Sequence, residues 1–310
     1  MIKHAYVATG VNDDTKQVSK NRWNEDHVID TELDLPVIAS PAPPVDGILA
    51  VYAKKVGGRT MLMQMGPSGL DTSFQPNLGG NKVAMWMPPG NSTTVPGVFG
   101  MVALTAVGTV TTRNVATTNM LTRMTRIGYV SAATAGSLAS IREAAAKYTL
   151  GAGAGLGGFF YRVRFGVSDA ATVAGARMFV GLSASTVSAT NVEPNTLTNA
   201  IGVCQLSTSN NLQFYCAGST ATTAIDLGAS FPANTLSTDA YELAMFAPSI
   251  GGEVNYTVTR MNTGDVASGK ITTGLPLGTQ LLCHQIWRTN NATALAVGLD
   301  LCGIYMETDY

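Results

Sequence analysis

The sequence predicts an all-β protein, and three observations support this fold class. Only 13% of the 310 residues are charged, whereas helical proteins cover their surfaces with Lys, Glu and Arg. The polar positions carry many Thr, Ser and Asn instead, which favour strands and turns. Short apolar or alternating segments are separated by Gly, Pro and Asn clusters at hairpin spacing. We therefore expect a short N-terminal segment, a small β-module and a large antiparallel β-sandwich or jelly roll.

Residues 1–35 form the polar N-terminal segment. The stretch VSKNRWNEDHVIDTEL within it carries six charged side chains, together with Trp23 and His27. His27 lies near the carboxylates of Glu25 and Asp26, which are donor types that a divalent ion uses, but no second histidine stands at ligand spacing. We expect a solvated or partner-packed cluster here, without a metal ion.

Residues 36–47 contain four prolines within nine residues and are expected to form an extended linker, because proline fixes φ and removes a hydrogen-bond donor. Residues 48–112 then predict a small β-module. It begins with ILAVYAKKVGGRTMLMQMG, which alternates like a hairpin with Gly57-Gly58 as its turn. Turn signals such as GPSGLD and WMPPGN delimit further short strands.

Residues 113–310 repeat this pattern on a larger scale and are expected to form the β-sandwich. Strand-like segments separated by turn residues occur at 159–166, 175–184, 200–207, 212–218, 240–247, 253–261, 279–289 and 294–310. The exception is GSLASIREAAAKYTL, residues 136–150, whose Ala-rich sequence after a possible N-cap at Ser137 favours a helix. The residues themselves leave helix and strand open for this segment.

Motifs of catalysis are weak in this chain. No G-x-S-x-G occurs. GAGAGLGG, residues 151–158, has the spacing of a dinucleotide-binding loop, but a strand-like segment follows it where that motif needs a helix. We expect a bend at which two backbones approach closely. The acidic residues of the large domain stand mostly at strand ends and turns, where Asp serves structural roles. The protein is therefore expected not to be an enzyme.

The cysteines, the net charge and the hydropathy of the chain bear on whether it binds cofactors, nucleic acid or membranes. The four cysteines form no C-x-x-C pair and are expected to be free buried thiols, although two of them could face each other across a hairpin, and no cofactor is expected. The formal net charge of −1 gives no footprint for nucleic acid. No window of about 18 uncharged apolar residues predicts membrane insertion. The first residues also lack the apolar core of a signal peptide.

A candidate for glycan contact is the stretch HQIWRTNNAT, residues 284–293. Its side chains Trp287, Arg288, Asn290 and Asn291 stand at a predicted junction of strand and loop. An exposed tryptophan would stack on a sugar ring, and the arginine and asparagines would bind hydroxyl groups. The alternative is a core tryptophan beside a polar turn, and the residues leave both interpretations open.

Three blocks of the sequence resemble structural proteins of tailed bacteriophages. SKNRWNEDHVI is similar to a short N-terminal motif of these proteins, a Trp-Asn pair before His-Val-Ile. GILAVYAKKVGGRTMLMQMGPSGLDTSFQPNL resembles a block of the same tail-associated proteins, and GGFFYRVRFGVSD and GLDLCGIYMETDY resemble their β-rich distal domain. The resemblance implies a lectin-like sandwich for residues 113–310 and carries no catalytic residues. It also implies that residues 136–150 belong to a sheet.

The resemblance implies a tail fibre or spike that attaches to the virion through residues 1–35 and engages host surface glycan with its β-sandwich. We expect the anchor to dock onto a tail, portal-adaptor or capsid protein by apolar burial and charge register, through Trp23, Asn24, His27, Val28 and Ile29. A homotrimer on the particle surface, assembled in the host bacterial cytoplasm, is expected because three copies bury strand edges. Two alternatives stay open: a capsid decoration or head-fibre protein, and a glycan depolymerase.

Overall fold

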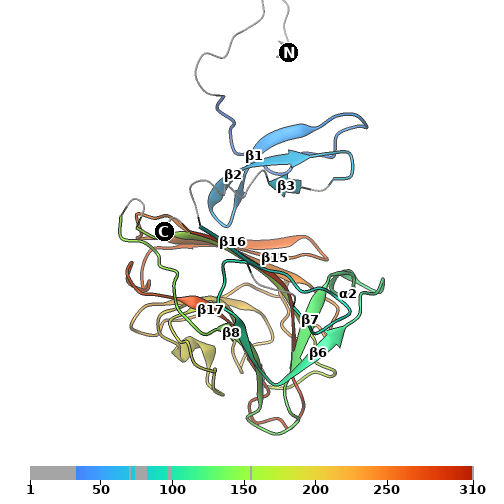
Figure 1. Ribbon diagram of the computed structural model, residues 1–310, viewed down its shortest axis with the longest axis vertical. Coiled ribbons are helices and arrows are strands. Elements are labelled where there is room, and N and C mark those ends of the chain that lie inside the picture. Colours follow the sequence, from blue (N-terminus) through green and yellow to red (C-terminus); the bar gives the residue numbers. More distant parts are fainter. Residues whose placement is uncertain (1–32, 70, 74–81, 96–98, 154–155, 309–310) are drawn as a thin grey trace, which may run out of the picture.

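The computed structural model describes residues 33–69, 71–73, 82–95, 99–153 and 156–308. Two antiparallel sheets form a sandwich, and a small three-stranded sheet lies on top of it in the view of Figure 1. Helical structure within the described residues is limited to α2 (Met120–Arg123) and the 3₁₀ turn η1 (Pro194–Thr196). The all-β class predicted from the sequence is confirmed.

The three-stranded sheet, called the module sheet below, consists of β1 (Ala50–Val56), β2 (Arg59–Met65) and β3 (Asp71–Ser73). Strands β1 and β2 form the hairpin that the sequence predicts, and its turn is Gly57-Gly58, with φ of +56° and +83°. Both angles lie in the left-handed region that glycine adopts without strain. The predicted module 48–112 is longer than this sheet, because the later strands of that range join the sandwich.

The seven-stranded sheet has the order β13-β12-β11-β10-β17-β8-β5. All its pairs are antiparallel. The strands, in chain order, are β5 (Leu104–Val107), β8 (Leu138–Glu143), β10 (Arg177–Ser183), β11 (Ala200–Gln205), β12 (Gln213–Ala217), β13 (Ile225–Asp226) and β17 (Cys283–Thr289).

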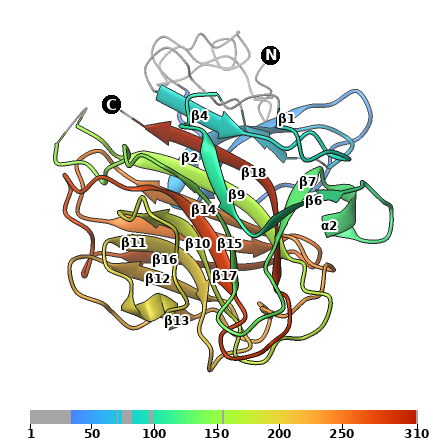
Figure 2. The same cartoon turned by 60° about the horizontal axis from the view of Figure 1, so that its bottom comes forward.

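The eight-stranded sheet has the order β16-β15-β14-β9-β18-β7-β6, with β4 paired to the second half of β18 (Figure 2). The strands, in chain order, are β4 (Lys82–Trp86), β6 (Thr109–Arg113), β7 (Arg126–Val130), β9 (Phe159–Val167), β14 (Tyr241–Ala247), β15 (Val254–Arg260), β16 (Asp265–Ile271) and β18 (Gly298–Thr308). Strand β16 was not among the predicted segments, because DVASGKI has no regular alternation of apolar and polar residues.

One apolar core fills the space between the two sheets. Alternate side chains of β9 and β14, such as Phe165 and Leu243, meet alternate side chains of β10 and β17, such as Val180 and Ile286. All four are fully buried. This period-2 burial on both sheets is the arrangement expected of a β-sandwich.

Residues 136–150 contain strand β8 (Leu138–Glu143) and no helix. Strand β8 pairs with β17 on one side and β5 on the other. Ile141 enters the core, and Glu143 is also buried. Pairing on both sides and burial of alternate residues outweigh the helix propensity of the alanine run that follows.

The glycine-rich segment before β9 is a bend between closely packed backbones. Gly158 has φ of +83°, and a Cβ at this position would lie 2.6 Å from the backbone nitrogen of Ser249. Strand β9 begins at the next residue. The structure therefore confirms a tight bend, followed by a strand, at this place.

Apolar side chains fasten the module sheet to the outer face of the eight-stranded sheet. Met61, Met63 and Tyr52 are buried in one cluster with Phe160 of β9 and Ala244 of β14. Burying side chains of this size contributes about 1.5–3 kcal/mol each as an upper bound. The module sheet and the sandwich therefore share an apolar contact of their own, separate from the main core.

Polar contacts fix the orientation of the same module sheet. Arg59 donates two hydrogen bonds to the carboxylate of Glu307, at 2.7 and 2.9 Å, and the Glu307 side chain is only 1% exposed. The backbone N–H of Gly57 donates to Oγ1 of Thr257 at 3.0 Å. A bidentate arginine–carboxylate pair requires a particular geometry, which apolar packing does not. The pair therefore fixes the orientation of the hairpin on the sandwich.

Candidate functional site

The predicted glycan-contact residues Trp287 and Arg288 lie inside the protein. Both are fully buried in strand β17. Trp287 packs against Phe179 and Tyr215 in an apolar cluster on the outer face of the seven-stranded sheet. That cluster also includes partly buried Ala189 and Leu197, which belong to the connection between β10 and β11. A side chain without exposed surface offers no stacking face to a sugar, so this part of the prediction is corrected.

Arg288 is part of a buried ion pair. Its guanidinium donates to the Asp169 carboxylate at 2.5, 2.9 and 3.1 Å, and both side chains have no exposed surface. Gln205 and Asn234 accept further hydrogen bonds from Arg288, at 2.7 and 3.0 Å. The backbone N–H of Gly298 donates to Asp169 at 2.7 Å. The group joins β17 to the segments beyond β9 and before β18, which is a structural role.

Asn290 is buried as well, and it organises the loops at one end of the sandwich. Its side-chain amide donates to the carbonyls of Thr134 and Leu295, at 2.9 and 2.8 Å. Asn291 has φ of +52° and is half-buried, and its carbonyl accepts from the N–H of Gly136 at 2.6 Å. The two asparagines that suggested sugar binding therefore connect loops.

The proposed anchoring residues Trp23, Asn24, His27, Val28 and Ile29 lie outside the described residues.

His284 is the buried histidine of strand β17. Its Nδ1 is 2.7 Å from the hydroxyl of Tyr161, and its Nε2 has no partner within the described part of the chain. Burial lowers the pKa of His284 to about 3. The ring is therefore neutral at neutral pH, enclosed in the core between the sheets.

We expect the free energy of unfolding to fall more steeply from pH 7 to pH 5 in the natural chain than in His284→Gln. The folded-state pKa lies below the ordinary 6.5, so the unfolded state binds the proton more strongly. The contribution of the neutral ring to the free energy of unfolding is present above about pH 6.5 and is lost as the pH falls toward 3. At pH 5 the loss is about 2 kcal/mol. Urea unfolding at both pH values measures the difference, and equal slopes in the two chains would contradict the burial of this ring.

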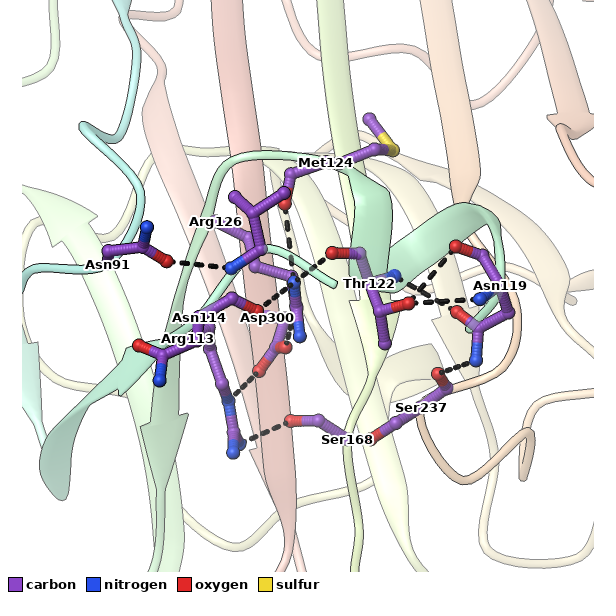
Figure 3. A network of polar contacts seen from close by, with 11 residues as sticks. Asn91, Arg113, Asn114, Asn119, Thr122, Met124, Arg126, Ser168, Ser237 and Asp300 are labelled. Carbon is purple, nitrogen blue, oxygen red and sulfur yellow. Dashed lines mark hydrogen bonds and ion pairs between the residues drawn. The ribbon is translucent and has the colours of Figure 1, made fainter. Parts of the chain in front are cut away.

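Asp300 of β18 is a buried carboxylate. In Figure 3 it lies between Arg113 of β6 and Arg126 of β7, and each arginine Nε is 2.9 Å from one of its oxygens. Arg126 also donates to the carbonyl of Thr122 in α2 at 3.0 Å, and Arg113 to the hydroxyl of Ser168 at 3.1 Å. Because both carboxylate oxygens are already paired, this group serves to tie β6, β7 and α2 to β18.

The four cysteines, Cys204, Cys216, Cys283 and Cys302, are free and buried. Cys204 pairs in register with Gln213 and Cys216 with Ile201, so the two do not face each other across the β11–β12 hairpin. Burial raises the pKa of the Cys216 thiol to about 12. Within the described ranges, no group of three or more metal-ligating side chains comes together, and no helix there is long and apolar enough to span a membrane.

The described residues form a groove of about 590 Å³ between the module sheet, β4 and the outer face of the eight-stranded sheet. Apolar side chains make up much of its lining. They come from elements far apart in the sequence, and they include Met61, Met85, Met87, Phe99, Phe160 and Tyr305. Met87 and Phe99 are more than half exposed. A groove of this volume is within the size range of sites that bind small ligands or sugar residues.

Two arginines of β9 form the polar part of the groove. Arg162 and Arg164 stand two residues apart on one face of the strand and both pair with Glu242 of β14, at 2.7 and 2.6 Å. Burial alone would raise the pKa of Glu242, but the two arginines hold it below its usual value. Sequence reasoning missed these residues. The available signal was FFYRVRFG, in which arginines replace apolar residues at alternate positions of a strand.

Comparison with known proteins finds similarity to solved structures, at low sequence identity. No family model and no curated protein matches this sequence. Peanut lectin in complex with a nine-residue peptide covers 74% of this chain and 97% of its own, with 12% identity and a TM-score of 0.47. The carbohydrate recognition domain of Emp47p covers 75% of this chain and 98% of its own, with 7% identity and a TM-score of 0.49. Arcelin-5, a lectin-like defence protein of Phaseolus vulgaris, covers 74% of this chain and 99% of its own, with 9% identity and a TM-score of 0.48.

The sheet topology itself is that of an antiparallel β-sandwich with a small three-stranded sheet. This confirms the all-β class and the sandwich expected from the sequence. The three solved structures named above have TM-scores below 0.5. The ligand chemistry of the groove therefore follows from its own side chains.

Proposed function

We propose that this chain is a structural protein of a bacteriophage particle, a tail fibre or spike. It attaches to the particle through residues 1–35 and engages host surface glycan through its β-sandwich. The observation that carries the binding part is the groove beside Arg162 and Arg164, where apolar and aromatic side chains adjoin two guanidinium groups. Sugar rings have apolar C–H faces and polar edges, and this combination of side chains complements both.

The attachment of the module sheet supports the structural part of the proposal. The bidentate Arg59–Glu307 pair and the buried methionines hold the module sheet on the sandwich as one body. A body of this kind keeps a receptor-binding surface at a fixed distance from its point of attachment. Of the proline-rich residues 36–47, which the sequence predicts to be a linker, Val37 forms a bridge with Ala53 of β1, and the Ile38 N–H donates to the Ala53 carbonyl at 2.9 Å. The start of the predicted linker is therefore held on the module sheet.

The outward side of the module sheet supports a homotrimer as the assembled form. Several large apolar side chains are exposed there and in the chain leading to it: Val37, Ile38, Val45, Ile48, Leu49, Val51 and Leu62. Three copies related by a symmetry axis would each bury the same set of side chains.

Deletion of residues 1–35 is expected to leave a folded chain that binds host cells but no longer joins particles. The two readouts are the amount of the chain in purified particles and its adsorption to host cells. Light scattering of the full chain should give three times the monomer mass of 32.3 kDa. Normal incorporation of the truncated chain would overturn the anchoring role, and a monomeric mass would overturn the trimer.

A further inference from the structure

The charge of the groove is positive, although the chain as a whole is nearly neutral. Among the described residues that line it, the charged side chains are Arg162 and Arg164. Their shared partner, Glu242, lies beside them on β14 with 10% of its side chain exposed, so one carboxylate balances two guanidinium groups. The pKa of nearby Lys54 is lowered, by burial first and by the charge of Arg162 second. This end of the groove therefore favours an anion.

The two guanidinium groups are within reach of a ligand. The Arg162 and Arg164 side chains are 34% and 41% exposed, whereas the pairs in the core of the sandwich are closed to solvent. Each makes its ion pair with Glu242 through one nitrogen, Nη2 in Arg162 and Nε in Arg164. The Nε of Arg162 is buried, so a ligand would reach the exposed part of each guanidinium rather than this nitrogen. A carboxylate is the acceptor that matches a guanidinium best.

Apolar side chains adjoin the arginines along the groove. Tyr305 stands directly across the β9–β18 pairing from Arg162, and Met85 of β4 pairs with Tyr305. Met87 and Phe99 continue this surface, and both are exposed. An aromatic face suits the C–H side of a sugar ring, and a flexible thioether suits a methyl group.

We propose that the groove binds an acidic, N-acylated sugar residue of a surface polysaccharide. Its carboxylate pairs with Arg162 and Arg164, and its acyl methyl group and ring face lie against Met85, Met87 and Tyr305. This inference rests on the proposed glycan binding and adds the chemical class of the sugar. A neutral sugar would leave the excess positive charge unpaired and is the weaker ligand.

The test uses the purified full chain and an immobilised panel of bacterial surface polysaccharides. Each acidic polysaccharide is presented in its native form and after chemical reduction of its carboxylates to alcohols. Binding to native acidic polysaccharides is expected to weaken at least about tenfold on carboxyl reduction, because a charge-assisted hydrogen bond is lost. The same loss is expected for Arg162→Gln and Arg164→Gln on the native forms.

Two further variants separate a binding role from a structural one. Gly303→Leu keeps both arginines and projects a side chain into the groove, because the atom nearest to a Cβ there is the Trp86 carbonyl oxygen at 3.6 Å. It should weaken binding while the thermal unfolding temperature stays unchanged. Arg177→Gln is the matched control, since Arg177 pairs with Glu193 on the other sheet, and it should bind as the natural chain does.

Four outcomes would overturn the inference. Equal binding to native and carboxyl-reduced polysaccharides would keep the glycan function and reject the acidic sugar. Unchanged binding by the Arg162, Arg164 and Gly303 variants would move the site elsewhere on the protein. Absence of binding to every polysaccharide would reject the proposed glycan function and the inference with it. Arginine-dependent binding to phosphatidylglycerol vesicles, without polysaccharide binding, would assign the groove to a lipid anion.

Discussion

Replacing Arg288 by methionine is expected to lower the free energy of unfolding by about 3–5 kcal/mol. The substitution leaves the Asp169 carboxylate without exposed surface and without its bidentate partner. A buried charge without a partner is far more costly than the pair is favourable. Gln205 and Asn234 would lose their donor at the same time. Urea unfolding of the variant and the natural chain at pH 7 measures the loss.

Two controls test whether the cost comes from the isolated charge. Lys270→Met removes an exposed ion pair with Glu253 and should change stability by less than about 1 kcal/mol. The double variant Arg288→Met/Asp169→Asn removes the charge but keeps an acceptor for the Gly298 N–H, and it should recover part of the loss. A double variant less stable than Arg288→Met alone would show that the stranded carboxylate is not the cause.

Substitution of Gly58 by alanine is expected to loosen the module sheet from the sandwich. A Cβ at Gly58 would lie 2.0 Å from Cβ of Asn255 and 2.4 Å from its Cγ, and the residue has φ of +83°. The left-handed backbone costs about 1–2 kcal/mol and the overlap about 1–3 kcal/mol more. Amide hydrogen exchange of β1 and β2 should speed up, and thermal unfolding should begin at a lower temperature.

The turn between β15 and β16 offers a matched control. Gly264 has φ of +81°, and nothing lies within 4 Å of a Cβ at that position. Gly264→Ala therefore carries the backbone strain without the overlap and should cost only about 1–2 kcal/mol. It should leave exchange in β1 and β2 unchanged. If Gly58→Ala costs no more than Gly264→Ala, the hairpin turn is not seated on Asn255 as the structure places it.

Local patterns predicted much of the fold. The alternation around Gly57-Gly58 identified the first hairpin, and FFYRVRFG identified strand β9. These features depend on period-2 burial and on turn chemistry, which the neighbours of a residue largely determine. For residues 136–150 the local sequence favoured a helix, but the structure has strand β8. The partners of β8 lie far away in the sequence, and pairing with them outweighs the helix propensity of the alanine run.

The candidate site was much less predictable. Trp287, Arg288 and Asn290 looked like a polar loop with an aromatic residue, yet their burial depends on β10 and on distant loops that cover them. The groove depends on strands β4, β9 and β18 and on the module sheet meeting in space. Strand pairing over such separations is not encoded in local pattern. The arginines of β9 therefore acquire their meaning only from the fold.

Strand β18 has a consequence for how the protein is made. It lies between β9 and β7 in the middle of its sheet and also pairs with β4, although it follows the other strands of the described residues in sequence. During synthesis on the ribosome, the edges of β9 and β7 that pair with β18 therefore stay unpaired until residues 298–308 have emerged. Contacts of such long sequence separation form slowly, and waiting edges invite aggregation. Overproduction should thus benefit from slow translation and low temperature, and a fusion that obstructs β18 should yield insoluble protein.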